Sequence, residues 1–187
     1  MARERKSNPR RMRPLFLVLC EGETEETYIN FLKQRYRLPI RIVPKVLGNS
    51  VCAKKVEQYK KEISYEPSEV KTFFMYDGDV PEVLEALKKC DGVLLITKPC
   101  IEIWFIAHYR KIPESEISSD SCLKQLRSIS GWEQYKKSIL TIKQQDFLWD
   151  NRMDAVNNMK DKTEKNKTYS TIYKFINILE EEKDHKI

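Results

Sequence analysis

Acidic side chains follow two apolar segments of the sequence, at points where buried strands are expected to end. Glu21 comes directly after the apolar run at residues 15–20, and Asp77 and Asp79 follow the apolar run at residues 71–76. In an open parallel sheet, ligands bind at the edge where the carboxyl ends of the strands meet. Carboxylates gathered there repel one another unless a cation compensates, and Mg²⁺ or Mn²⁺ accepts such oxygen ligands. The pattern therefore predicts a divalent-metal site made by Glu21, Asp77 and Asp79.

Helix capping is the alternative explanation for part of this acidic group. Glu23, Glu25 and Glu26 lie at the start of a helix expected over residues 24–36, where negative charge stabilises the positive end of the helix dipole. Glu25 is therefore a candidate both for capping and for catalysis, and Glu21 taken alone is equally ambiguous. The Asp-x-Asp after a second buried strand is what favours a metal site.

Glu102 and Lys98 are further candidates, and both are assigned to substrate binding. Glu102 lies in the first turn of an apolar helix expected over residues 99–109, where an unpaired charge is costly. It either faces the metal, as a ligand or a neighbour, or is stabilised by the helix N-terminus. Lys98 could offset carboxylate charge or contact a phosphate, whereas His108 is expected to be structural. The aromatic residues expected in the core are Trp104, Phe105, Trp132 and Trp149.

An alternation of strands and helices must position these residues. The apolar runs lack internal alternation, as in strands that are buried on both faces of a parallel sheet. The segments between them show helical spacing. The pattern predicts an α/β fold with a three-layer, doubly wound, mostly parallel sheet. The strands are expected at residues 15–20, 40–46, 71–76 and 92–97, and the helices at residues 24–36, 51–63, 81–90 and 99–109.

The composition changes after Pro113, and no convincing strand pattern follows. A charge-rich loop is expected at residues 160–167, and the acidic tail at residues 180–182 is expected to be solvated. The remainder predicts a helical C-terminal region that packs on the sheet. Its helical patterns lie at residues 123–129, 153–159 and 169–179.

Charge and composition limit the class of protein. The first fourteen residues hold six basic side chains against Glu4, which accounts for most of the net charge of +6. This arm either adds salt-dependent affinity for nucleic acid or is a solvated terminus. No apolar run approaches the roughly 18 residues of a membrane span, and five cysteines without a Cys-x-x-Cys pair favour free thiols in the cytoplasm over a zinc site. The predicted organisation is a basic flexible arm at residues 1–14, an α/β domain at residues 15–112 and a helical region at residues 113–187.

The order of the acidic motifs resembles a known protein family. The Toprim domain carries a Glu after its first strand and an Asp-x-Asp after its third. The sequence resembles it in Leu19-Cys20-Glu21-Gly22-Glu23-Thr24-Glu25 and in Tyr76-Asp77-Gly78-Asp79. A third motif is similar to the RloB-like family, a Toprim group found beside bacterial restriction and anti-phage loci. This motif is Pro99-Cys100-Ile101-Glu102-Ile103-Trp104, with His108 and Tyr109.

The resemblance implies a Toprim-type nuclease that cleaves DNA or RNA with Mg²⁺ (or Mn²⁺) in phage defence or abortive infection. Asp77 and Asp79 would hold the metal, and Glu21 would complete the coordination or act as general acid or base. The chain itself has no P-loop, so an ATPase would have to be a separate partner encoded nearby. The resemblance also leaves a homo-oligomer open. Lys98 is a departure, since the family usually carries Asn there.

Three other functions remain open from the sequence. The strand that ends in Asp77-Gly78-Asp79-Val80 also resembles the nucleophile motif of haloacid dehalogenase-type (HAD-like) phosphatases, although their motif follows the first strand. A receiver-like phosphotransfer at Asp77 is the second alternative, and it lacks a clear lysine on a fifth strand. The third is a non-catalytic module that binds metal and nucleic acid.

Overall fold

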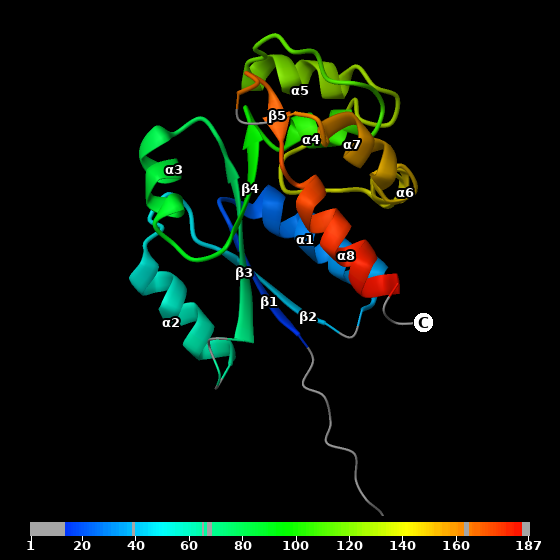
Figure 1. Ribbon diagram of the computed structural model, residues 1–187. Coiled ribbons are helices and arrows are strands. Elements are labelled where there is room, and N and C mark those ends of the chain that lie inside the picture. The colour runs from blue at the N-terminus through cyan, green and yellow to red at the C-terminus, as the bar shows by residue number, and fades with distance from the viewer. Residues whose placement is uncertain (1–13, 39, 65, 67–68, 163–164, 185–187) are drawn as a thin grey trace, which may run out of the picture.

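The computed structural model describes residues 14–38, 40–64, 66, 69–162 and 165–184. These residues form a mixed α/β fold around a five-stranded sheet (Figure 1). The strands are β1 (Leu15–Cys20), β2 (Arg41–Val46), β3 (Val70–Asp77), β4 (Val93–Lys98) and β5 (Tyr169–Ser170). The helices are α1 (Glu23–Tyr36), α2 (Ala53–Ile63), α3 (Pro81–Lys88), α4 (Glu102–Ala107), α5 (Ser119–Arg127), α6 (Ile142–Asp150), α7 (Arg152–Met159) and α8 (Tyr173–Asp184).

The sheet has the strand order β2-β1-β3-β4-β5. The first four of these strands are parallel, and β5 pairs with β4 in the antiparallel direction. The expected α/β class and mostly parallel sheet are therefore confirmed. The basic arm predicted at residues 1–14 falls outside the described residues except for Pro14, and the domain limit at residue 112 stays a prediction.

The central strands are buried on both faces because their side chains alternate between two cores. Phe16 and Phe73 pack in the core formed with α1 and α8, whereas Leu17 and Phe74 pack in the core formed with α2 and α3. Figure 1 shows these two pairs of helices on opposite sides of the sheet. The uninterrupted apolar runs are thus confirmed as strands with two buried faces.

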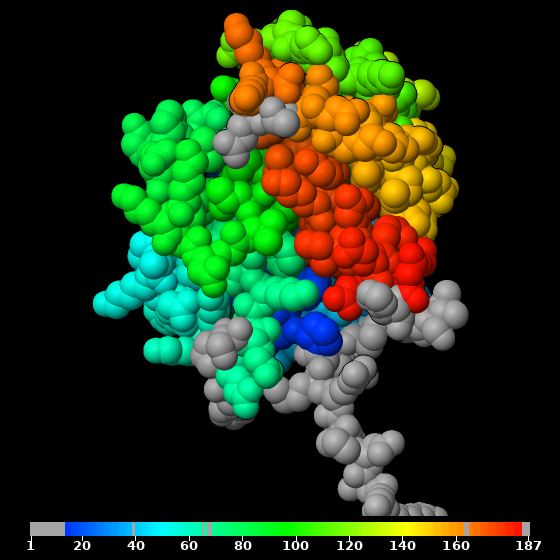
Figure 2. Space-filling view, viewed as in Figure 1, coloured from blue at the N-terminus to red at the C-terminus, as the bar shows by residue number. Residues whose placement is uncertain are grey.

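The segment after residue 112 differs from the prediction in three places. Tyr169–Ser170 forms strand β5 where the sequence favours a helix, because two residues are too few to show a period. Helix α6 has no predicted counterpart. The acidic residues 180–182 belong to α8, where Glu181 is exposed as expected but Glu180 is partly buried. Figure 2 shows the orange and red part of the chain, which contains β5 and α8, lying against the green and yellow parts of the molecule.

Helix α4 is shorter than expected but is buried as predicted. It covers only residues 102–107 of the predicted span 99–109, and all six of its side chains are buried. His108 follows the helix, with Nδ1 2.9 Å from the backbone oxygen of Trp104. Burial lowers the pKa of His108 to about 4, so the ring is neutral at pH 7. The contact of Nδ1 agrees with a structural histidine, whereas Nε2 is buried without a hydrogen-bond partner among the described residues.

Two expectations from composition can be compared with the structure. All five cysteines lie within the described residues, and each is a free thiol. The expectation of free thiols is therefore confirmed. Among the described helices, none combines the length and apolar character that crossing a bilayer requires.

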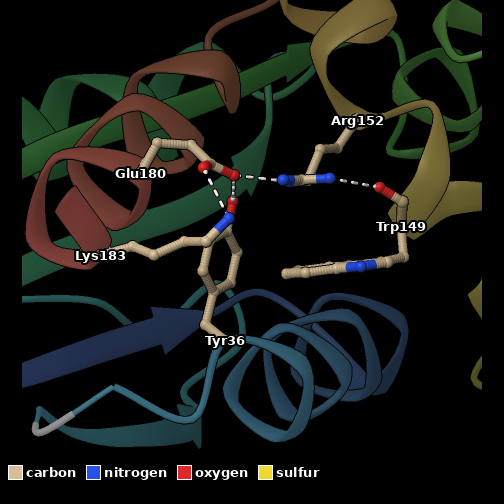
Figure 3. Close-up of polar contacts among 5 residues, drawn as sticks. All are labelled: Tyr36, Trp149, Arg152, Glu180 and Lys183. Atoms are coloured by element: carbon tan, nitrogen blue, oxygen red, sulfur yellow. Dashed lines mark hydrogen bonds and ion pairs between the residues drawn. The ribbon is translucent and has the colours of Figure 1, made fainter. Parts of the chain in front are cut away.

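Glu180 ties α8 to α1 and α7. Tyr36 Oη donates to Glu180 Oε1 at 2.7 Å, and Arg152 Nε donates to the same oxygen at 2.6 Å (Figure 3). Arg152 also donates to the backbone oxygen of Trp149 at 2.9 Å, and Lys183 lies 3.4 Å from Glu180 Oε2. Burial by itself raises the pKa of Glu180, but the hydrogen bonds from Arg152 and Tyr36 outweigh it, and the pKa is lowered.

We expect Glu180→Gln to lower the free energy of unfolding by about 1–2 kcal/mol at pH 7, because two donors lose their charged acceptor. Because the folded-state pKa of Glu180 is lowered, its contribution is present above the unfolded pKa and is lost as the pH falls through the folded pKa. Urea unfolding should therefore show the gap between wild type and variant closing below about pH 4. Glu181→Gln, an exposed neighbour, is the control. A gap that persists at low pH would contradict this role.

Candidate functional site

The order in which the chain adds strands to the sheet reverses between β1 and β3. From β1 the chain goes to β2 on one side, and it then returns to form β3 on the other side of β1. Because α1 and α3 then cover opposite faces, the ends of β1 and β3 flank a crevice. The N–H of Asp77 donates to Glu21 Oε2 at 2.8 Å, and the N–H of Glu21 donates to Met75 O at 3.0 Å. Glu21 and Asp77 therefore lie side by side at this switch point.

A small pocket with a volume of about 280 Å³ lies at this point, and five acidic residues line it. Four of them, Glu21, Glu25, Asp77 and Glu102, are buried or half-buried, whereas Glu23 is exposed. The end of β1, the end of β3 and the start of α4 supply one acid each, and the start of α1 supplies two. Lys137, from the connection between α5 and α6, lines the same space. We call it the carboxylate pocket.

Asp77 and Asp79 face different spaces. Side chains alternate along β3, so Asp77 continues the series of Met75 and faces the side of α1 and α4. Asp79 lies beyond the strand, is exposed, and lines a neighbouring cleft of about 930 Å³ together with Lys98. We call this space the polar cleft. Glu21, Asp77 and Asp79 are thus not gathered in one pocket, although the charge of Asp79 helps to raise the pKa of the other two.

Glu102 is the most deeply buried acid of the pocket. Only 1% of the surface of Glu102 is exposed to solvent. Tyr135 Oη donates to Glu102 Oε1 at 3.2 Å, whereas Oε2 accepts no hydrogen bond from the described residues. Of the two interpretations from the sequence, the structure supports a Glu102 that faces the other acids.

Glu25 caps α1 and also lines the carboxylate pocket. The N–H of Gly22 donates to Glu25 Oε2 at 3.1 Å, which satisfies a backbone donor at the start of α1. Burial raises the pKa of Glu25, and the charges of Glu21 and Glu102 add to the effect. The capping interpretation is confirmed for Glu25, and its catalytic role stays a prediction.

The acids of the pocket repel one another strongly. Burial, together with the negative charges of Glu25, Glu21, Glu102 and Asp79, raises the pKa of Asp77 to about 9. Burial also raises the pKa of Glu21, although the N–H of Asp77 opposes the change. Asp77 is therefore protonated at neutral pH unless a cation compensates the charge around it.

Lys137 is a pocket residue that the sequence does not reveal. It is one of 34 Lys and Arg residues, and it lies in a stretch without a helical or strand period. Only the packing of the α5–α6 connection against the start of α1 brings it to the acids. No local pattern could have singled it out.

The donor set fits a divalent cation. Asp77 Oδ1 and Glu102 Oε2 are buried and accept no hydrogen bond from the described residues, which is costly for a carboxylate. Hard oxygen ligands with a surplus of negative charge suit Mg²⁺ or Mn²⁺. Within the described ranges, no three Asp, Glu, His or Cys side chains form a ready-made metal-binding group. Asp77 and Glu102 would hold the cation after their side chains turn toward it, and ligand roles for Glu21 and Asp79 stay predictions.

Comparison with known proteins places the chain in a family. The family model described as RloB-like protein matches residues 16–179. Comparisons with curated proteins and with solved structures gave no match. The matched range contains every residue that lines the carboxylate pocket and extends into α8. Because the match spans most of the chain, the protein belongs to the RloB-like family.

Proposed function

We propose that this RloB-like protein cleaves phosphodiester bonds of DNA or RNA with a divalent metal ion. The buried, unpartnered oxygen of Glu102, in the same pocket as Glu21 and Asp77, carries the proposal. Buried carboxylates that serve only the fold have hydrogen-bond partners, whereas a metal site needs free oxygens. A Toprim-like three-layer form of the fold, a cytoplasmic location and a role in phage defence belong to the same proposal.

The residues of the pocket have separate proposed roles. A bound Mg²⁺ or Mn²⁺ would polarise the phosphodiester and lower the pKa of the attacking water. Asp77 and Glu102 would bind the cation. Glu21 would accept the proton, because its pKa is raised and the N–H of Asp77 orients it. Glu25 would hold the start of α1 in place through its bond to Gly22.

The polar cleft offers room for the rest of the substrate. The carboxylate pocket, at about 280 Å³, lies at the lower limit for a small ligand, whereas the polar cleft measures about 930 Å³. The end of β3 and the connection that follows it border the two spaces, since Asp77 lines the pocket and Gly78 and Asp79 line the cleft. Nucleotides that flank the scissile phosphate would lie in the cleft, where Lys98 would contact their backbone.

Phosphotransfer at Asp77 has less support than nuclease activity. A nucleophilic carboxylate must be free to attack, whereas an Asp77 that binds the proposed cation would have its oxygen engaged by the metal. The acidic lining of the pocket therefore favours cation binding over phosphotransfer. A non-catalytic module would use the same residues, so the distinction between binding and cleavage needs an activity measurement.

We expect Mn²⁺ to raise the melting temperature of the wild-type protein, because a ligand that binds only the folded state stabilises it. In chelator, Asp77→Asn should be more stable than wild type by about 1–3 kcal/mol, since Asn removes a buried acid with a raised pKa. The raised folded-state pKa destabilises wild type above the unfolded pKa of about 4, so the advantage of the variant should shrink toward about pH 5. Scanning calorimetry measures both effects.

Glu82→Gln provides the matched control for this experiment. Glu82 is an exposed acid at the start of α3 and lines neither the carboxylate pocket nor the polar cleft. This variant should keep the wild-type response to Mn²⁺, and Asp77→Asn should lose it. An equal Mn²⁺ response in Asp77→Asn and wild type would contradict a metal at this site.

We expect the purified protein to cleave plasmid DNA, single-stranded DNA or transfer RNA in Mg²⁺ or Mn²⁺, and not in chelator. Glu21→Gln and Asp77→Asn should each slow cleavage at least about a hundredfold, because they remove a proton acceptor and a metal ligand. Glu82→Gln should retain the rate to within about twofold. Unchanged cleavage in both acid variants would refute the proposal. Binding of metal and nucleic acid without cleavage would favour the non-catalytic module.

A further inference from the structure

Lys137 reaches the carboxylate pocket from a segment that is distant from the acids in sequence. It lies in the connection between α5 and α6, whereas the acids of the pocket lie between the end of β1 and the start of α4. The negative charge of Glu102 raises the pKa of Lys137, so its ammonium group stays charged at neutral pH. The pocket thus pairs a group of acids with a positive charge from another part of the chain.

Two hydrogen bonds hold the backbone of Ser138 against α1. The N–H of Ser138 donates to Thr24 Oγ1 at 3.1 Å, and Thr27 Oγ1 donates to Ser138 O at 3.1 Å. Ser138 has a φ of 66°, which lies in the left-handed region that disfavours residues with a side chain. The two hydrogen bonds offset this cost, and they fix the neighbouring Lys137 beside the pocket.

Lys137 lies near the acids without being paired to one of them. It is largely exposed, and it forms no ion pair within 4.0 Å with a carboxylate of the described residues. A lysine that served only as a structural counter-charge would be expected to form a close pair. An unpaired ammonium group beside a group of metal-binding acids is instead available to an anion that enters the pocket.

We propose that Lys137 binds a non-bridging phosphate oxygen of the phosphodiester substrate at the mouth of the carboxylate pocket, positioned by Thr24 and Thr27 through Ser138. This inference rests on the proposed function, because it assigns the phosphate contact of the same site. The α/β core then supplies the metal ligands and the proton acceptor, and the segment between α5 and α6 supplies the phosphate contact.

The test compares substrate binding with metal binding. Short fluorescent single-stranded DNA and RNA are titrated in Ca²⁺ by anisotropy, and Mn²⁺ is titrated by calorimetry. Lys137→Met should weaken oligonucleotide binding about tenfold or more, as expected for a lost charge-assisted hydrogen bond. Its Mn²⁺ affinity should be unchanged or higher, because a positive charge near the ligands is gone. Lys137→Arg keeps the charge and should recover most of the lost affinity.

Lys136→Met is the matched control for Lys137→Met. Lys136 is the preceding residue on the same connection, is exposed, and lines neither the carboxylate pocket nor the polar cleft. Its removal changes the net charge equally and should leave specific binding at the pocket intact. An equal loss of affinity in both variants would mean that only the overall charge matters, and would overturn the proposal.

A pair of double variants tests the positioning of Lys137. Thr24→Val with Thr27→Val removes both hydroxyls and keeps the side-chain shape. It should weaken oligonucleotide binding about threefold or more while the Mn²⁺ affinity holds. Thr24→Ser with Thr27→Ser restores the hydroxyls and should recover the binding that the Val pair loses. Equal binding by the two double variants would overturn the positioning role.

The outcomes separate this inference from the proposed nuclease activity. Binding that depends on Lys137 without cleavage of any substrate would refute the nuclease and leave the phosphate contact standing. If Lys137→Met changes neither cleavage nor oligonucleotide binding, the nuclease proposal stands and the phosphate contact of Lys137 is refuted. Wild-type protein that binds no oligonucleotide, or a Lys137→Met variant that loses Mn²⁺ binding, would also overturn the inference. Circular dichroism of each variant, with Lys137→Gln as a second neutral substitution, checks that the fold is retained.

Discussion

Repulsion among buried carboxylates is the constraint on which the rest of the site depends. Glu21, Glu25, Asp77 and Glu102 share a pocket of about 280 Å³, and the pKa of Asp77, raised to about 9, reflects the cost. A protein that needed only stability could fill this space with neutral side chains and gain free energy. The surplus of charge is therefore the feature from which we propose a cation and a substrate at this site.

The sheet brings these acids together through its strand order and register. β1 and β3 are neighbours, and the pairing of Cys20 with Met75 leaves Glu21 beside Asp77 at the switch point. Alternation along β3 directs Asp77 toward α1 and α4, while the residues before it fill the cores on both faces. The burial of these apolar strands stabilises the fold and offsets the free-energy cost of the carboxylates at the edge of the sheet.

Sequence patterns predicted the features that depend on local order, and missed those that depend on distant contacts. Uninterrupted apolar runs located β1 and β3, and therefore Glu21 and Asp77 at their ends. Asp79 lies beyond the strand, so the alternation that directs Asp77 does not fix its direction. β5 is too short to show a period. Glu180 looks like a solvated acid until α1 and α7 surround it, and Lys137 gains its neighbours only when the chain folds.

Helix α1 links the acidic part of the site to the part of the chain that follows it. Near its N-terminus, Thr24 Oγ1 accepts a hydrogen bond from the N–H of Ser138, and Glu25 lines the pocket. At its C-terminus, Tyr36 donates to Glu180 of α8. Segments beyond residue 112 therefore hold α1 at both ends, and one of these contacts is adjacent to an acid of the pocket. Because Thr24 and Glu25 of α1 line the pocket, a shift of the helix would also move these two residues. The acids need the sheet, Lys137 needs the C-terminal segment, and α1 is the element that both share.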